Sequence, residues 1–128
     1  MAGAIGLGAA LDFINSLDQT RCLQHEQQLI NYTQQALQQI PDITVFASET
    51  QKSGSNSLVV KGEHNSDIAM LLDAQGIAVR SGTHCAMPLM SSLQCNGTIR
   101  ASFSIYNTLE EAAAFITALK NVILMLQE

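Results

Sequence analysis

The sequence predicts an α+β domain in which helices cover mainly one face of a short sheet. Its 128 residues, 47% of them hydrophobic, suffice for a single domain with its own core. Apolar residues recur at helical spacing in several segments, and β-branched residues form short runs between them. The expected order is two helices, two strands, a helix, a strand, a loop, a strand and a helix, which is typical of an α+β sandwich.

The first half of the chain predicts two consecutive helices. Residues 4–17 form an apolar run rich in Ala and Gly, so we expect a helix that packs closely on a neighbouring element. Residues 18–40 form an amphipathic pattern, which Pro41 ends. The inward face of this second helix is expected at a seven-residue repeat of Leu23, Ile30 and Leu37.

The remaining elements are shorter, apart from the last helix. β-Branched runs predict strands at Ile43–Ala47 and Leu58–Lys61, joined by the polar loop Ser48–Asn56. Ser66 is the expected N-cap of a helix that runs through Ala74 and ends at Gly76. Two more strands are predicted at Ile77–Arg80 and Thr98–Ile105.

A capping box predicts where the last helix begins. Thr108 is followed three residues later by Glu111, the spacing at which the two side chains can bond each other's backbone amides. The inward residues of this helix are then expected to be Phe115, Leu119, Val122 and Leu126.

The charge balance excludes several classes of partner. Six basic against eleven acidic residues give a formal charge of −5, which disfavours nucleic acid and anionic membranes. No stretch approaches the roughly 20 apolar residues that span a bilayer, and the N-terminus lacks the basic region of a secretory signal. We therefore expect a cytoplasmic protein without membrane or nucleic-acid partners.

The three cysteines, Cys22, Cys85 and Cys95, form no CxxC pair and no cluster at zinc-ligand spacing. An odd number without such spacing disfavours both a disulfide framework and a structural metal. We therefore predict free thiols in a reducing compartment and no metal site.

Residues 76–90 combine features that favour a reactive cysteine. A predicted strand ends at Arg80, a loop of small residues follows, and Pro88 is suited to begin a short helix. Cys85 is therefore expected on a loop near a helix start, close in sequence to Arg80 and His84. Helix N-termini and cationic neighbours both favour thiolate, the nucleophilic form. The alternative is a buried cysteine that acts as a small hydrophobic residue.

Arg100 interrupts the apolar strand predicted at residues 98–105. Burying an arginine is costly unless it pairs with an anion, and a planar guanidinium can bind a carboxylate through two hydrogen bonds. An arginine on the solvated face of a half-buried strand is the equally open alternative.

Two motifs are similar to those of a known enzyme family. These are RSGTHCA at residues 80–86 and RASFSIYNT at residues 100–108. With GAIGLGAAL at residues 3–11, they resemble the SufS/CsdA-like cysteine desulfurases, group II members of the class V aminotransferase superfamily. The resemblance covers essentially the whole chain, and the short connection 91–97 is similar to the compact active-site loop of group II. It implies the small C-terminal domain of fold-type I pyridoxal phosphate (PLP) enzymes, with a short mixed sheet covered by helices.

The resemblance also implies roles for individual residues. Cys85 matches the nucleophile that removes sulfur from L-cysteine, which leaves L-alanine and a persulfide. Arg100 matches the arginine that binds the substrate carboxylate. Arg80 and His84 are expected to support the site, although a solvent-exposed loop histidine is the favoured alternative for His84. Cys95 and Cys22 match no family nucleophile, and Cys22 is expected to pack within its helix.

The resemblance leaves one requirement unmet, because PLP chemistry needs a lysine that bonds the cofactor. The lysines Lys52, Lys61 and Lys120 do not match the family's cofactor-binding segment. We therefore expect residues 1–128 to be the small domain of a cysteine desulfurase without its large PLP-binding domain, to bind no cofactor and to be inactive alone. An apolar patch for the large domain is expected on the helices at 4–17 and 109–127.

The whole enzyme would belong to iron–sulfur cluster assembly. Its implied partners are L-cysteine, the large domain, the second subunit of a homodimer and a sulfur-acceptor protein.

Two alternative functions remain open. A stand-alone persulfide carrier would also use Cys85, but it would not need Arg100 at this spacing. A class V lyase acting on selenocysteine or cysteine sulfinate would place the same carboxylate on Arg100.

Overall fold

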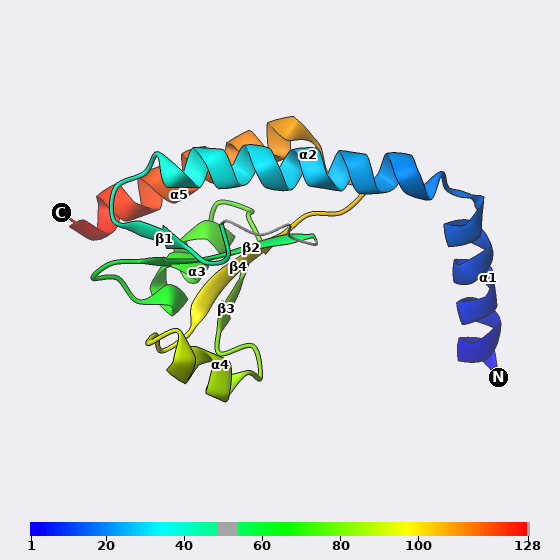
Figure 1. Ribbon diagram of the computed structural model, residues 1–128, viewed down its shortest axis with the longest axis horizontal. Coiled ribbons are helices and arrows are strands. Elements are labelled where there is room, and N and C mark those ends of the chain that lie inside the picture. Colours follow the sequence, from blue (N-terminus) through cyan, green and yellow to red (C-terminus); the bar gives the residue numbers. More distant parts are fainter. Residues whose placement is uncertain (49–53, 128) are drawn as a thin grey trace.

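The computed structural model describes residues 1–48 and 54–127. Figure 1 shows a sheet with long helices on one side. The helices are α1 (Ala2–Ser16), α2 (Gln19–Gln38), α3 (Asn65–Asp73), α4 (Met87–Ser92) and α5 (Leu109–Gln127). The strands are β1 (Ile43–Val45), β2 (Ser55–Val60), β3 (Arg80–Gly82) and β4 (Thr98–Ser102).

The four strands form one sheet in the order β1-β2-β4-β3. Every strand pair within the described residues is antiparallel. The predicted α+β class is confirmed, although this sheet is antiparallel rather than mixed. Of its two central strands, β2 alternates strictly between partly exposed and buried positions, whereas β4 begins with two buried residues in succession, Thr98 and Ile99.

Helices α2, α3 and α5 cover one face of the sheet. Helix α5 packs on both α2 and α3, which in turn lie on the strands. Leu58 of β2 and Ile99 of β4 are fully buried and are directly paired across the strands, so both side chains enter this layer. The centre of the core also contains Leu37, Ile68, Leu72, Leu119 and Val122. The predicted inward residues of the last helix are buried, except that Leu126 is only partly so.

Helix α1 forms as predicted but does not pack on a neighbour in this chain. None of its residues is buried, and a Cβ added at Gly3, Gly6 or Gly8 would meet no atom within 4 Å. Figure 1 shows α1 extending away from the sheet beyond the N-terminal end of α2. The expectation of close packing is therefore wrong for the described chain. Leu23 is 67% exposed for a related reason, because the first turns of α2 extend past the core.

The apolar surface is concentrated on α1 rather than shared equally with α5. The exposed apolar side chains of α1 are Ile5, Leu7, Leu11, Phe13 and Ile14. On α5 most apolar residues enter the core, and the exposed large ones are Leu109, Leu124 and Met125. The two helices therefore contribute very different amounts to any apolar patch.

The capping box at the start of α5 is confirmed. The amide of Thr108 donates to Glu111 Oε2 at 3.0 Å, and the amide of Glu111 donates to Thr108 Oγ1 at 3.2 Å. The start of α2 is also fixed by a side chain, since Asp18 accepts hydrogen bonds from the amides of Thr20 and Arg21.

The start of α3 differs from the prediction. His64, not Ser66, is the N-cap, because the His64 carbonyl accepts the first helical bond, from the amide of Ile68. Ser66 lies inside the first turn, where its hydroxyl donates to Asp67 Oδ1. Gly76 ends this helix as predicted, with a φ of +79°.

The strand predicted at Ile77–Arg80 is displaced and lies at Arg80–Gly82, while β1 and β4 are shorter than predicted and end at Val45 and Ser102. The amide of Ile77 donates to the carbonyl of Leu72 in the helix-ending motif, so β3 begins only at Arg80. Strand β4 ends at Ser102, since the amide of Ser104 donates to Asn107 Oδ1. Strand β2 is longer than expected and starts at Ser55. The central part of the loop predicted at Ser48–Asn56 lies outside the described residues.

Candidate active site

The face of the sheet opposite α2, α3 and α5 carries Ser57, Arg80, Thr98 and Arg100, and we call it the arginine face. The two arginines are direct cross-strand partners in β3 and β4, and Ser57 pairs with Arg100 from β2. Arg100 is half-buried and Arg80 is exposed. Like charges directly opposite each other destabilise a sheet, so this pairing favours a bound anion between the two side chains.

The hydrogen bonding of Arg100 supports the same interpretation. Its Nε is buried and has no hydrogen-bond partner. No carboxylate of residues 1–48 or 54–127 forms an ion pair with either arginine. A buried donor without an acceptor costs free energy, and a substrate carboxylate would supply the missing acceptor.

A loop from Gly82 to Gly97, which we call the cysteine loop, connects the two arginine-bearing strands. Gly82 pairs with Thr98 where the loop leaves the sheet. Gly97 has a φ of +141°, and a Cβ there would lie 2.9 Å from the carbonyl carbon and oxygen of Gly82. Only glycine permits this close approach, so the two ends of the loop are held together at the arginine face.

Cys85 is exposed on this loop, just before α4. The amide of Ala86 donates to the Thr83 carbonyl at 2.9 Å. The φ angles of the two residues between them are +54° for His84 and +59° for Cys85. A bond of this kind across two positive φ angles is the pattern of a type I′ turn, which normally requires Gly, Asn or Asp. The predicted position on a loop near a helix start is confirmed, and the thiol is not a buried hydrophobic residue.

His84 is not the solvent-exposed loop histidine that sequence reasoning favoured. It is half-buried, and its Nε2 lies 3.1 Å from the carbonyl oxygen of Thr98 and 3.0 Å from Thr98 Oγ1. The prediction was wrong because the positive φ of His84 turns the loop back onto β4. Thr98 itself is 1% exposed and was not selected from the sequence.

A second histidine missed by the sequence analysis fixes the segment after β4. His25 Nε2 of α2 lies 2.8 Å from the carbonyl oxygen of Asn107, and Asn107 Nδ2 donates to Glu111 Oε2 at 3.1 Å. The contact joins residues 82 positions apart, and no local pattern around His25 predicts it. It holds Asn107, the middle residue of the YNT segment at 106–108, beside α2.

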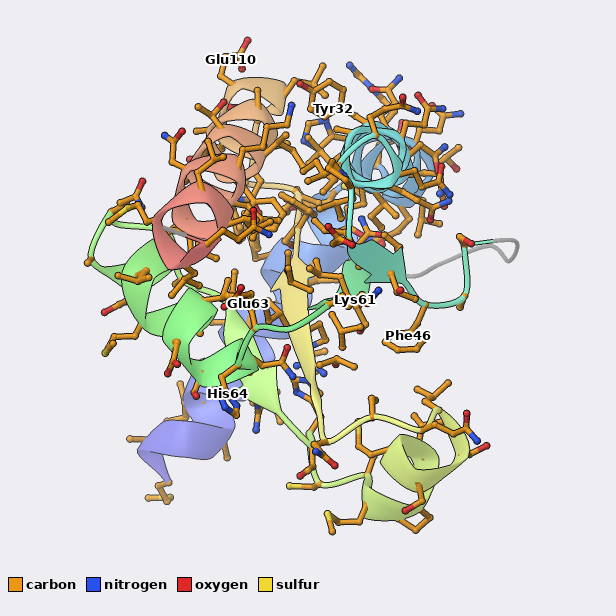
Figure 2. All side chains as sticks on the ribbon, turned by 90° about the vertical axis from the view of Figure 1, so that its left-hand side faces the viewer. Tyr32, Phe46, Lys61, Glu63, His64 and Glu110 are labelled. Carbon is orange, nitrogen blue, oxygen red and sulfur yellow. The ribbon has the colours of Figure 1, made fainter. Side chains whose placement is uncertain are left out.

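The Glu110 carboxyl, at the start of α5, has a lowered pKa. A hydrogen bond from its own backbone amide, and another from the Thr108 side chain, hold the pKa of the Glu110 carboxyl below its usual value. Figure 2 shows Glu110 at the start of α5, which is on the helical side of the sheet.

The other cysteines lie apart from the exposed turn. Cys22 is half-buried on α2, and Cys95 is half-buried with its Sγ 3.8 Å from Met90 Sδ. All three cysteines are free. Within the described parts of the chain, no group of three or more His, Cys, Asp or Glu residues could hold a metal ion, and no helix is long and apolar enough to cross a membrane.

The two described lysines are on different elements. Lys61 is exposed directly after β2 and lies near β1 (Figure 2). Lys120 is on α5, which packs on the face of the sheet opposite the arginine face. Lys52 lies outside the described residues.

The chain is similar to curated proteins named as cysteine desulfurases. The chain is 45% identical over 123 residues to a probable cysteine desulfurase of Vibrio cholerae, covering 96% of this chain and 30% of the relative. It is 39% identical over 120 residues to a cysteine desulfurase of Klebsiella pneumoniae, covering 94% of this chain and 29% of that protein. The chain thus spans about 30% of the length of these curated relatives.

Solved structures give the same result. The cysteine desulfurase CsdA of Escherichia coli superposes with a TM-score of 0.92 at 35% identity, covering 97% of this chain and 31% of that one. The cysteine desulfurase of Thermococcus onnurineus superposes with a TM-score of 0.86 at 36% identity, covering 94% and 30%. The family model for aminotransferase class-V matches residues 1–115. The chain belongs to the class-V aminotransferase family.

Proposed function

We propose that this chain is the sulfur-accepting and carboxylate-binding part of a PLP-dependent cysteine desulfurase, which we call the parent enzyme. The observation that carries the proposal is the position of Cys85 on a loop whose two ends are the strands that carry Arg80 and Arg100. The short, closed loop thereby joins the exposed Cys85 thiol to the anion-binding surface of Arg80 and Arg100.

Arg100 binds the carboxylate of L-cysteine in this proposal. Its buried, unpartnered Nε gains an acceptor, and the carboxylate offsets the repulsion between the paired arginines. Arg80 supports the site by adding positive charge from the neighbouring strand. A stand-alone persulfide carrier would gain nothing from this pair, so the arginine face favours the desulfurase.

Cys85 accepts the sulfur atom. Its thiolate attacks the sulfur of L-cysteine, so a bond forms between the two sulfur atoms while the carbon–sulfur bond of the substrate breaks. The carbon keeps the electron pair of that bond and takes up a proton. L-Cysteine and the Cys85 thiol thus become L-alanine and a Cys85 persulfide, without an external oxidant or reductant.

Lys52, Lys61 and Lys120 do not match the cofactor-binding lysine segment of the family that the chain resembles. We therefore place the cofactor on a large domain of the parent enzyme and propose that residues 1–128 alone are inactive. The chain covers only 30% of the length of a curated relative, which supports placing the cofactor on a separate large domain. We further propose a SufS-like, homodimeric parent enzyme that passes the persulfide to an acceptor protein for iron–sulfur cluster assembly.

The test begins with the 128-residue chain itself. It is mixed with PLP and L-cysteine, and alanine is measured against a protein-free control, which is needed because PLP reacts slowly with free amines. We expect no protein-dependent alanine from the chain and alanine from the parent enzyme. Saturable PLP binding with alanine turnover by the chain would mean that one of its three lysines holds the cofactor, and the division would be wrong.

A further inference from the structure

The side chain of His84 joins the turn that presents Cys85 to the strand that carries Arg100. Its Nε2 lies within hydrogen-bond distance of the Thr98 carbonyl oxygen, at 3.1 Å. A carbonyl oxygen can only accept a hydrogen bond, so this contact is a hydrogen bond when Nε2 carries the ring proton and donates it. The loop backbone is paired with Thr98 at Gly82. The His84 contact, which spans 14 residues, fixes the turn that carries Cys85 to the same strand.

The opposite nitrogen of the ring takes no part in the contact. Nδ1 of His84 is buried and has no hydrogen-bond partner. The ring is therefore held through Nε2 alone, by the carbonyl and the hydroxyl of Thr98. Any side chain that places a donor at the position of Nε2 should reproduce the contact, whereas a donor at the position of Nδ1 should not.

The turn needs such an outside contact. His84 and Cys85 both have left-handed φ angles, which are unfavourable for residues with a Cβ. The only backbone bond that closes the turn is the one from the Ala86 amide to the Thr83 carbonyl. Strained conformations of this kind persist when the surrounding structure fixes them, and the His84–Thr98 contact does so.

The His84–Thr98 contact links the positions of the two proposed functional groups, the Cys85 thiol and the Arg100 side chain. Thr98 and Arg100 are two residues apart on β4, so their side chains are on the same face, about 7 Å apart along the strand. A loop fixed to Thr98 therefore has a fixed position relative to Arg100. Without the contact, the thiol would remain exposed but would no longer be held relative to the bound carboxylate.

We propose that His84 is a positioning residue that fixes the Cys85 turn to β4 through Nε2–H and so sets the position of the thiol relative to Arg100. This inference rests on the proposed desulfurase function for its effect on the reaction. The contact itself can be tested independently, on the 128-residue chain.

The first test measures the contact. Long-range proton–nitrogen NMR spectra of the imidazole rings should show His84 with its proton on Nε2, and a proton only on Nδ1 would overturn the proposal. His84→Ala should accelerate hydrogen exchange of the Ala86 amide at least about tenfold, as the turn opens locally. His84→Gln should restore slow exchange, because its amide nitrogen can reach the Thr98 carbonyl. Unchanged exchange in His84→Ala would overturn the proposal.

The second test measures the reaction in the parent enzyme. His84→Ala and His84→Asn should lower kcat for alanine formation by up to about 100-fold, as expected for a thiol misplaced by about 1 Å, while KM for L-cysteine stays within about twofold. His84→Gln should recover most of kcat. His64→Ala is the matched control, since His64 is exposed and makes no side-chain cap bond.

The outcomes of the second test separate the two proposals. An equal loss of kcat in the Gln and Ala variants would assign His84 a merely structural role and refute the inference. A wild-type parent without desulfurase activity would refute the proposed function. The tautomer and the Ala86 exchange rate would then decide whether the His84–Thr98 contact holds the turn.

Discussion

On one face of the sheet Leu58 and Ile99 pack against α2, α3 and α5, whereas the other face carries Arg80 directly opposite Arg100. The first arrangement is what apolar burial favours. The second, together with two left-handed φ angles at His84 and Cys85, is unfavourable for stability alone. The contrast teaches that one face maintains the fold, while the other places charged and strained groups where a substrate can use them.

A change on the helical face should have the largest effect on stability. Leu119 of α5 is fully buried in the core, so Leu119→Ala should lower the free energy of unfolding by about 2–5 kcal/mol. Urea denaturation of the 128-residue chain measures this. A loss below about 1 kcal/mol would show that α5 is not tightly packed on the sheet and would weaken the comparison.

A change on the arginine face should instead affect substrate binding. Arg100→Ala relieves the repulsion with Arg80, so the free energy of unfolding should change by less than about 1 kcal/mol. In the parent enzyme, loss of the charged hydrogen bonds should weaken L-cysteine binding by about 2–5 kcal/mol, measured as a rise in KM or a loss of kcat/KM. Unchanged kinetics would make Arg100 a structural residue.

At the two ends of the cysteine loop, the stability of the chain should depend on glycine. A Cβ at Gly97 would meet the Gly82 backbone at 2.9 Å, so Gly97→Ala should destabilise the chain by about 1–3 kcal/mol. Gly6→Ala is the matched control. Its Cβ would meet no atom within 4 Å, and α1 buries nothing, so the unfolding of the core should not change. Equal effects of the two substitutions would refute the close approach of Gly82 and Gly97.

The smallest effect is expected at the exposed start of α5. The pKa of Glu110 is lowered in the folded chain by its own amide and by Thr108. The carboxylate therefore stabilises the fold above the pKa of unfolded glutamate, and this contribution is lost as pH falls through the lowered pKa. Urea unfolding of wild type and Glu110→Gln should differ slightly at pH 7 and coincide near pH 2. If the difference between wild type and Glu110→Gln instead grew as the pH fell, hydrogen bonding to the Glu110 carboxylate would not be its cause.

The helical face could be predicted from the sequence because apolar spacing and the capping box are local features of the chain. Apolar spacing placed Phe115, Leu119 and Val122 in the core, and the capping box placed the start of α5. The prediction failed at α1 and Leu23, where apolar residues are not buried by the described chain. Apolar spacing indicates that a side chain favours burial, but it does not say which chain buries it.

The candidate site could be predicted only in part. The motifs selected Cys85 and Arg100, and the expected loop before a short helix is confirmed. The register that places Arg80 opposite Arg100, and the contacts of His84 with Thr98 and of His25 with Asn107, depend on tertiary folding. Sequence spacing does not contain these long-range relations, which is why His84 was expected in solvent.

The position of the persulfide tests the central claim most directly. The parent enzyme is treated with L-cysteine, alkylated rapidly and digested, and the sulfur-bearing peptide is identified by mass spectrometry. We predict the extra sulfur on Cys85, its loss together with alanine formation in Cys85→Ser, and neither loss in the matched Cys95→Ser variant. A persulfide on Cys95 or Cys22, or sulfur transfer that persists in Cys85→Ser, would contradict the account.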